Sequence, residues 1–398
     1  MNGGGRRYII AGGLIDGTGA DVRRNVCLVV EDSIIAAIGP VSQISRKAGA
    51  AVDDFSHCTM LPALVDCSVY LSRSPSVDKR MQLSSEQAGL AAKMALIGRH
   101  IHYCHAHGVL GVADGGDGQN LVGRHRKGRP EWGEIDIRTS GRLCRGGEAG
   151  EACEDADGDF LKIAYSGGIA DEEDACPRLD HADLCRFLQR RDGQMAVVVA
   201  NGERQVAEAI EAGCDAIEQG YSMGEDNLRK MAEKNILWIP SVLQAKNALD
   251  GSGSGGEVCC RFSLRYVAPG RAVPGGEAFW KKVLADQLAQ LRFARKTGVR
   301  TAVGTGAGSM GILHGESVAE EMKLFIKAGY SLGETFHCAS ENGARFFGMN
   351  NIGPLAVGNK ATFLITRGTA QQLPRKLSYL EGIYVGGAPS ATYRKNPA

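Results

Sequence analysis

The chain has 398 residues, a length that can bury one large hydrophobic core or two unequal ones. Its 46 basic and 45 acidic residues leave a net charge of +1 without a sustained block of either sign, so the composition does not indicate a nucleic-acid partner or an anionic membrane. We expect a small-molecule ligand or another protein as the partner, and the sequence leaves a homo-oligomer open.

The start of the chain and its cysteines indicate a compartment. Met1 to Arg7 leads into Tyr8-Ile9-Ile10 without an apolar signal segment, and no apolar run is long enough to span a membrane. The 12 cysteines have no repeated spacing and form no Cys-x-x-Cys motif, a pattern typical of buried thiols in a reducing compartment. We therefore expect a cytoplasmic protein without a structural zinc.

Both ends of the chain have the pattern of β structure. Short apolar segments separated by Gly- and Asp-rich turns run from Tyr8 to about Val41, and again over residues 355–365 and 380–387. We predict that residues 1–60 and 350–398 form one composite β-sandwich domain.

After Leu61 the pattern changes to apolar strands that alternate with helices, which is typical of parallel β/α architecture. The candidate strands are residues 64–70, 109–113, 135–139, 160–165, 195–200, 216–219, 237–242 and 300–304. The candidate helices include residues 203–212, 226–235, 279–297 and 318–328. Eight strands are the number needed for a closed barrel, so we predict an α/β fold with a (β/α)8 TIM barrel over residues 61–349.

Residues 249–277 interrupt this pattern with Gly- and Pro-rich clusters between the seventh strand and its helix. In a barrel the loops that follow the strands form the active-site face, so this loop is either a lid over a site or a tolerated surface insertion. The sequence leaves both alternatives open.

Several segments carry a family resemblance. Residues 59–65, Thr-Met-Leu-Pro-Ala-Leu-Val, resemble the strand that opens the barrel of the amidohydrolase superfamily, and residues 12–19 resemble its opening turn. Residues 342–345 and 353–358 resemble its closing segment. The chain therefore resembles the amidohydrolase superfamily, closest to its prolidase-like and imidazolonepropionase-like branch.

This resemblance implies two divalent metals held by histidines, a carboxylated lysine and an aspartate. The matching positions hold Ser68, Tyr70, Lys162, Val199, Gln219 and Gly306, so only the lysine is kept. Catalytic zinc needs about three protein ligands, which the other five residues cannot supply. We predict that the protein has neither a metal nor another cofactor and does not use the metal-hydroxide mechanism of the family.

Other positions of the matching pocket differ as well. The loop after Cys144 resembles a Thr-Gly-Gly-His-Gly loop but holds Arg145 and Glu148, whereas His314 matches the family's His-Gly-Glu-Ser motif. By resemblance, the catalytic candidates are Lys162, Tyr70 and His314. The substrate-binding candidates are Ser68, Arg145, Glu148, Asn201, Gln219, Tyr221 and Gly306.

Lys162 is open to two interpretations. Leu161 and Ile163 flank it in an interior strand, and desolvation there would lower the pKa of its amine and favour a neutral base or Schiff-base nucleophile. The alternative is a relic lysine that forms an ion pair with Glu148 or a similar acid.

Two other motifs have the residue types of a functional site. His100, His102, His105 and His107 end the helix before the second strand, so we expect them on the outer ring, away from the catalytic loops, as surface residues. Residues 306–311 fit Gly-x-Gly-x-x-Gly but follow the eighth strand, which argues against a dinucleotide and favours a phosphate or carboxylate.

These patterns support two functions. The first is a metal-independent hydrolase or lyase that acts on a small polar or carboxylate-bearing molecule, and the alternative is a catalytically silent pseudoenzyme that binds a ligand or regulates a partner. Convergent polar groups around a perturbed lysine favour the first, and a pocket filled by side chains such as Tyr70 and Gln219 favours the second.

Overall fold

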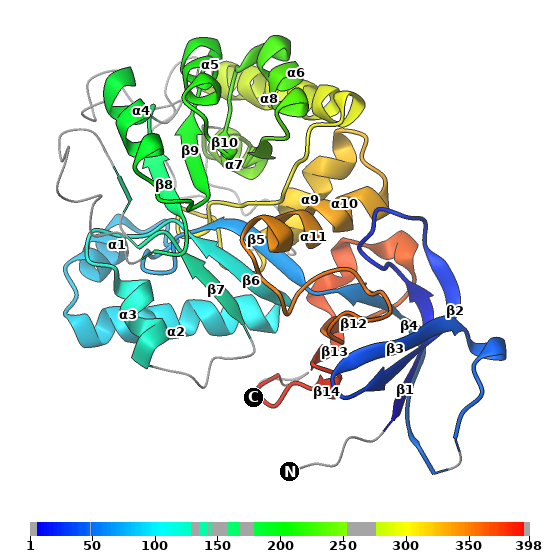
Figure 1. Ribbon diagram of the computed structural model, residues 1–398. Coiled ribbons are helices and arrows are strands. Elements are labelled where there is room, and N and C mark those ends of the chain that lie inside the picture. The colour runs from blue at the N-terminus through cyan, green and yellow to red at the C-terminus, as the bar shows by residue number, and fades with distance from the viewer. Residues whose placement is uncertain are drawn as a thin grey trace.

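A computed structural model describes residues 6–47, 49–128, 135–141, 143–144, 158–167, 179–252 and 276–393. The fold is α/β. In Figure 1 the strands of the two chain ends lie together on one side of the molecule, and the parallel strands of the middle region lie among helices. Within the described ranges, no helix is long and apolar enough to cross a membrane.

Strands from both chain ends form one seven-stranded sheet in the order β14-β13-β12-β4-β1-β2-β3. The strands are β1 (Arg7–Leu14), β2 (Arg23–Glu31), β3 (Ile34–Pro40), β4 (Ala51–Pro62), β12 (Phe363–Arg367), β13 (Leu380–Val385) and β14 (Ala388–Pro389). Strand β4 joins the two ends, because it pairs in parallel with β1 and antiparallel with β12. The termini therefore share a sheet, as the sequence predicts. Their described strands form one sheet, so the β-sandwich and the domain boundaries stay predictions.

The middle of the chain contributes two parallel sheets, β5-β6-β7 and β11-β10-β9-β8. Their strands are β5 (Leu64–Val69), β6 (Val109–Asp114), β7 (Asp136–Thr139), β8 (Leu161–Ala164), β9 (Ala196–Ala200), β10 (Ala216–Gln219) and β11 (Leu237–Ile239). Most of their residues are buried, which explains why these segments are nearly continuous apolar runs rather than alternating ones.

The eighth predicted strand, residues 300–304, is not a regular strand. It meets β11 through one bridge from Trp238 to Thr301, with hydrogen bonds of 2.8 Å from Trp238 N to Arg300 O and 2.9 Å from Ala302 N to Trp238 O. A hydrogen bond of 2.9 Å from Cys67 N to Val303 O joins it to β5. Just beyond it, Gly306 has a φ of +72°, which is incompatible with an extended strand. The predicted strand pairing is therefore reduced to isolated backbone contacts at residues 300–304.

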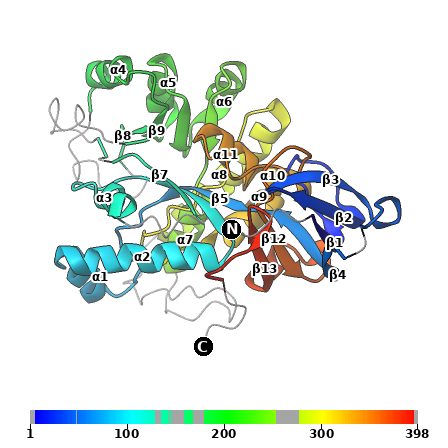
Figure 2. The ribbon, with the colours of Figure 1, turned by 60° about the horizontal axis from the view of Figure 1, so that its bottom comes forward.

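Helices pack beside the parallel strands. They are α1 (Lys79–Glu86), α2 (Leu90–Ala106), α3 (Leu121–Gly128), α4 (His181–Gln189), α5 (Glu203–Glu211), α6 (Gly224–Glu233), α7 (Val242–Ser252), α8 (Gly276–Thr297), α9 (Ser317–Lys327), α10 (Leu332–Cys338) and α11 (Glu341–Phe346). Figure 2 shows α4, α5 and α6 grouped along one side and α1 and α2 along another. Gly213 and Gly298 follow α5 and α8 with φ values of +92° and +78°, the left-handed conformation that ends a helix.

Two sequence expectations change at this level. Helix α7 extends to Ser252 and α8 begins at Gly276, so the centre of the predicted lid at 249–277 lies outside the described residues. Among the free cysteines that the structure describes, Cys185 is partly exposed and the others are buried. Cys144 is disulfide-bonded, so the expectation of thiols throughout is wrong at this residue.

Candidate functional site

Side chains from β5, β8 and β10 meet in a buried ion pair. Lys162 Nζ, on β8, lies 2.7 Å from Glu218 Oε2, on β10, and the two side chains are 2% and 1% exposed. Ser68 Oγ, on β5, donates a hydrogen bond of 2.9 Å to Glu218 Oε1. Both oxygens of the Glu218 carboxylate are therefore occupied by groups of the protein itself.

This pair decides the protonation state of Lys162. Burial is the largest single influence and lowers the pKa of Lys162, but Glu218 and Tyr70, which both interact with the amine, together hold the pKa above its ordinary value. The direction of this shift favours the charged amine over the neutral nucleophile. The geometry agrees with the interpretation of an ion-paired lysine, with Glu218 as the acid.

The Tyr70 ring lies against this cation. Lys162 Nζ is 4.8 Å from the centroid of the Tyr70 ring, and the Arg73 guanidinium carbon is 4.1 Å from the same centroid. A Cβ at Gly115 would lie 2.5 Å from Tyr70 Cε1 and 2.9 Å from Lys162 Nζ, so no side chain fits there. Tyr70 thus fills space beside the amine through its ring, and cation–π attraction favours this arrangement.

A second buried carboxylate, Asp66, ties β5 to the segment after residue 300. Thr305 N donates to Asp66 Oδ1 at 2.9 Å, and Thr305 Oγ1 donates to Oδ2 at 2.6 Å. Burial raises the pKa of Asp66 to about 7, although the hydrogen bonds from Thr305 lower it. Both oxygens of the carboxyl group accept hydrogen bonds within the protein.

Three amide side chains form a chain of hydrogen bonds, and they come from the residue after β9, from the end of β10 and from the first turn of α7. Asn201 Nδ2 donates to Gln219 Oε1 at 2.7 Å, and Gln219 Nε2 donates to Gln244 Oε1 at 3.2 Å. Gly306 has a φ of +72°, which favours glycine, and a Cβ there would lie 2.0 Å from Gln244 Nε2 and displace that side chain. Gln219 itself has a φ of +70°, a strained backbone conformation that is often found at functional sites.

Tyr221 does not face this amide chain with its hydroxyl group. The residue is buried, its backbone N donates to Asn201 Oδ1 at 3.0 Å, and its hydroxyl donates to Ser241 O at 2.8 Å. Burial raises the pKa of Tyr221. Tyr221 therefore supports the position of Asn201, and its hydroxyl is already used within the protein.

His314 lies in a stack with His100. The two ring centroids are 3.8 Å apart, with an angle of 15° between the ring planes. His314 Nε2 contacts Tyr70 O at 3.1 Å and His100 Nδ1 contacts Leu71 O at 2.8 Å, which assigns the donor nitrogen of each ring. Burial lowers the pKa of both imidazoles. The stack thus fixes the chain that follows β5.

The predicted surface cluster of histidines is wrong for two of its members. His100 is buried in the stack with His314, and His105 is buried with Nε2 3.1 Å from Ser390 Oγ. His102 is exposed and His107 is partly exposed. The helix period explains the division, because residues two apart on α2 face different directions.

The glycine-rich loop at 306–311 does not present the expected anion cradle. Gly306 N donates to Ser68 O at 2.7 Å, Gly308 N donates to Ile312 O at 3.1 Å, and Gly311 N donates to Pro75 O at 2.8 Å. These amides bond carbonyl groups of the protein, so they are not available to a phosphate or carboxylate.

Sequence comparison identifies the family. The model of the amidohydrolase family matches residues 182–394, more than half of the chain. The chain belongs to the amidohydrolase family. No curated protein matches it in sequence.

Solved structures of other amidohydrolases have the same fold. A Xaa-Pro dipeptidase with bound methionine in the active site superposes with a TM-score of 0.77 at 19% identity, over 97% of this chain and 99% of that one. The ochratoxinase of A. niger gives a TM-score of 0.77 at 18% identity, over 97% and 95% of the two chains. Phenylurea hydrolase B gives 0.73 at 16% identity, over 97% of each chain. At these identities the likeness concerns the fold alone.

The residues of this amidohydrolase do not fit the binuclear metal centre that the resemblance implies. Ser68 and Lys162 are both engaged with Glu218, and Gln219 is bonded to other amides. Within the part of the chain that the structure describes, no group of three or more His, Cys, Asp or Glu residues could hold a metal. Lys162 is kept at the position of the bridging lysine, but its amine is paired with Glu218.

The sequence pattern missed several residues of this site. Glu218, Asp66, Thr305 and Gln244 complete the network, whereas Arg145 and Glu148 lie outside the described residues. A signal for Glu218 was present, because a carboxylate within the apolar strand Ala216-Ile217-Glu218 needs a buried partner. Nothing local in the sequence identified that partner.

Proposed function

We propose that this chain is a catalytically silent amidohydrolase that binds a small polar molecule or regulates a partner and does not use metal-hydroxide chemistry. The Lys162–Glu218 ion pair of 2.7 Å is the main support for this proposal. Lys162 is the one residue kept from the family's ligand positions, and its amine is already bound to Glu218. A protonated, paired amine is not a nucleophile, and Ser68 is bonded to the same carboxylate.

We further propose that the parallel strands close into an eight-stranded barrel. Single bridges from Cys144 to Ile163, from Trp238 to Thr301 and from Val69 to Ala307 support this closure, because they connect the edges of the two parallel sheets to each other and to the segment after Arg300. The ion pair would then lie inside the barrel, with the amide chain at the ends of its strands.

The amide chain supports an uncharged, polar ligand group on this face. Asn201, Gln219 and Gln244 are partly exposed and offer donors and acceptors without a net charge. In the described part of the chain, Gln244 Nε2 has no hydrogen-bond partner. A carboxamide or similar group could therefore exchange hydrogen bonds with these side chains.

Borohydride trapping of a Schiff base at Lys162 tests whether the protein is catalytically silent. We expect that pyruvate with borohydride at pH 7 leaves Lys162 unlabelled in peptide maps, because its amine is paired and protonated. A Lys162 adduct at a pH where exposed lysines do not react would overturn the proposal.

Elemental analysis after purification without chelators tests the metal-free site. We expect substoichiometric zinc, iron, nickel and manganese. One or more metals per chain that are lost in Lys162→Met would contradict the proposal.

A metal-independent enzyme is the second candidate, and Asp66 favours it. A carboxyl group with a pKa of about 7 is suited to proton transfer at neutral pH. This candidate predicts turnover of a C–N-bonded substrate with a pH dependence that Asp66→Asn removes. Absence of turnover across a panel of N-acyl amino acids, dipeptides and cyclic amides would favour the silent protein.

A further inference from the structure

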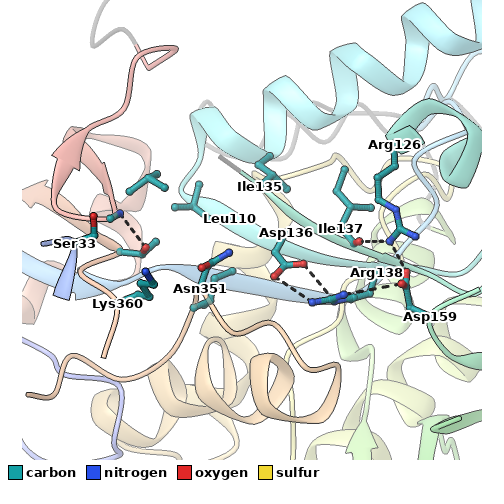
Figure 3. Close-up of a pocket in the computed structure, with 14 residues that line it drawn as sticks. Ser33, Leu110, Arg126, Ile135, Asp136, Ile137, Arg138, Asp159, Asn351 and Lys360 are labelled. Carbon is teal, nitrogen blue, oxygen red and sulfur yellow. Dashed lines mark hydrogen bonds and ion pairs between the residues drawn. The ribbon is translucent and has the colours of Figure 1, made fainter. Parts of the chain in front are cut away.

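A second polar region lies at the opposite ends of the parallel strands, between them and the seven-stranded sheet. A cavity of about 700 Å³ opens there, a volume in the range of small-molecule sites. Its lining comes from the beginnings of β6 and β7 and from the turns around Ser33, Lys360 and Gly386. Figure 3 shows Ser33 and Lys360 at one end, Arg126 and Asp159 at the other, and Asp136 and Arg138 between them.

Hydrogen-bond donors gather at one end of this cavity. Lys360, Asn351 and Ser33 all line it, and Lys360 and Asn351 are exposed. In the ranges that the structure covers, the side chains of these three residues have neither an ion pair nor a hydrogen bond. The group consists of an ammonium, a carboxamide and a hydroxyl, without a carboxylate among them.

The charges at the other end neutralise one another. Arg138 Nε lies 3.3 Å from Asp136 Oδ1, and Arg126 Nη1 lies 2.5 Å from Asp159 Oδ2. Arg138 also donates to Gly348 O at 2.7 Å, and Arg126 donates to Ile137 O at 2.8 Å. The two carboxylates are therefore engaged and do not offer a site for a cation. Among the lining residues that the structure describes, this leaves Lys360 as the uncompensated charge.

Apolar side chains connect the two ends. Leu110, Ile135 and Ile352 line the cavity and are buried, and Val385 lines it from β13. Leu110, Ile135 and Ile352 expose little surface to water, so Val385 is the side chain among these four whose apolar surface a ligand would remove from water.

We propose that this cavity binds an organic anion. The anionic group, such as a carboxylate, lies at Lys360, Asn351 and Ser33, and the apolar body of the ligand packs against the partly exposed Val385. The site is separate from the Lys162–Glu218 pair and does not depend on the function proposed for that pair. It gives a silent amidohydrolase a place for a ligand that does not use the family's metal centre.

Isothermal titration calorimetry of the full chain with two matched probes tests whether the cavity prefers a negatively charged ligand to a positively charged one. The probes are 3-phenylpropionate and 3-phenylpropylamine, which share the aromatic body and differ in the charged group. We expect saturable binding of one phenylpropionate per chain and binding of the amine at least about tenfold weaker. Equal binding of the two probes, or no binding of phenylpropionate, would overturn the proposal.

Substitutions in the lining of the cavity test whether the probe binds there. Lys360→Met should weaken phenylpropionate binding about tenfold or more, and Lys360→Arg should retain most of it. The matched control Lys327→Met removes an exposed lysine of α9 and should leave binding unchanged. Val385→Trp should block the apolar part and abolish binding. Unchanged binding in both Lys360→Met and Val385→Trp would place the probe elsewhere and refute this site.

Discussion

The two charged regions of this protein contain similar residues but differ in how far their side chains are exposed to solvent. The Lys162 and Glu218 side chains are 2% and 1% exposed, whereas Arg138 and Asp159 in the cavity of Figure 3 are 27% and 23% exposed. In the buried region each charge has its partner within the protein. Among the described residues of the cavity, one cation, Lys360, is left for a ligand. Burial thus separates charges that hold the fold from charges that are available for binding.

Breaking the buried pair should give the largest effect. Glu218→Gln leaves the Lys162 charge buried without a carboxylate, and loss of one partner of a buried pair costs about 3–5 kcal/mol. Urea unfolding at pH 7 measures this cost. The double variant Lys162→Met/Glu218→Gln should recover most of the loss, because neither charge remains.

A matched control for this prediction is the exposed pair of Arg229 and Glu225, whose side chains are 49% and 60% exposed. Glu225→Gln should cost less than about 1 kcal/mol, because water screens exposed pairs. Equal losses in Glu218→Gln and Glu225→Gln would mean that burial does not separate the two kinds of charge.

Asp66 should make stability fall as pH rises. Its native pKa of about 7 lies above the ordinary value of 3.8, so the native protein keeps a proton that the unfolded chain releases. The contribution is full below about pH 4, falls between about pH 4 and 7, and is constant above that, with a total of about 2–4 kcal/mol. Asp66→Asn should remove this slope when unfolding is followed from pH 4 to 8. An unchanged slope would contradict the assignment.

The His100–His314 stack should act in the opposite direction. Burial lowers the pKa of His314 below 6.5, so the unfolded chain takes up this proton first as pH falls. Its contribution to stability is full above about pH 6.5 and decreases below it, by at most about 2 kcal/mol at pH 5. His314→Phe keeps an aromatic ring and should reduce this acid loss, whereas His102→Phe, at an exposed position, should not. Equal acid loss in wild type and His314→Phe would contradict the prediction.

Lys360 should have the smallest effect on stability. It is exposed and forms no ion pair within the described ranges, so Lys360→Met should change the free energy of unfolding by less than about 0.5 kcal/mol. The same variant is expected to weaken binding of the anionic probe. A stability loss comparable with that of Glu218→Gln would show that Lys360 holds the fold and would remove the contrast between the two regions.

The sequence by itself determined the order of strands and helices, because the periods of apolar residues differ between the two kinds of element. It also determined the loss of the family's ligands, since Ser68, Gln219 and Gly306 can be identified by resemblance alone. The same reasoning left the state of Lys162 open between a neutral amine and an ion pair. The local sequence indicates that a lysine is buried, but it does not indicate which charged side chains lie beside it in the folded protein.

Only the tertiary structure decided that Glu218 is the partner of Lys162 and that Gln219 bonds to amides instead. Successive residues of a strand face opposite sides, so one position along β10 separates a buried carboxylate from the amide chain. The cavity at Lys360 likewise exists only in the fold, because its walls come from β6, β7, β13 and turns far apart in the chain. Electrostatic partners and cavities depend on distances in space, which are set when the sheets pack and not by any local pattern.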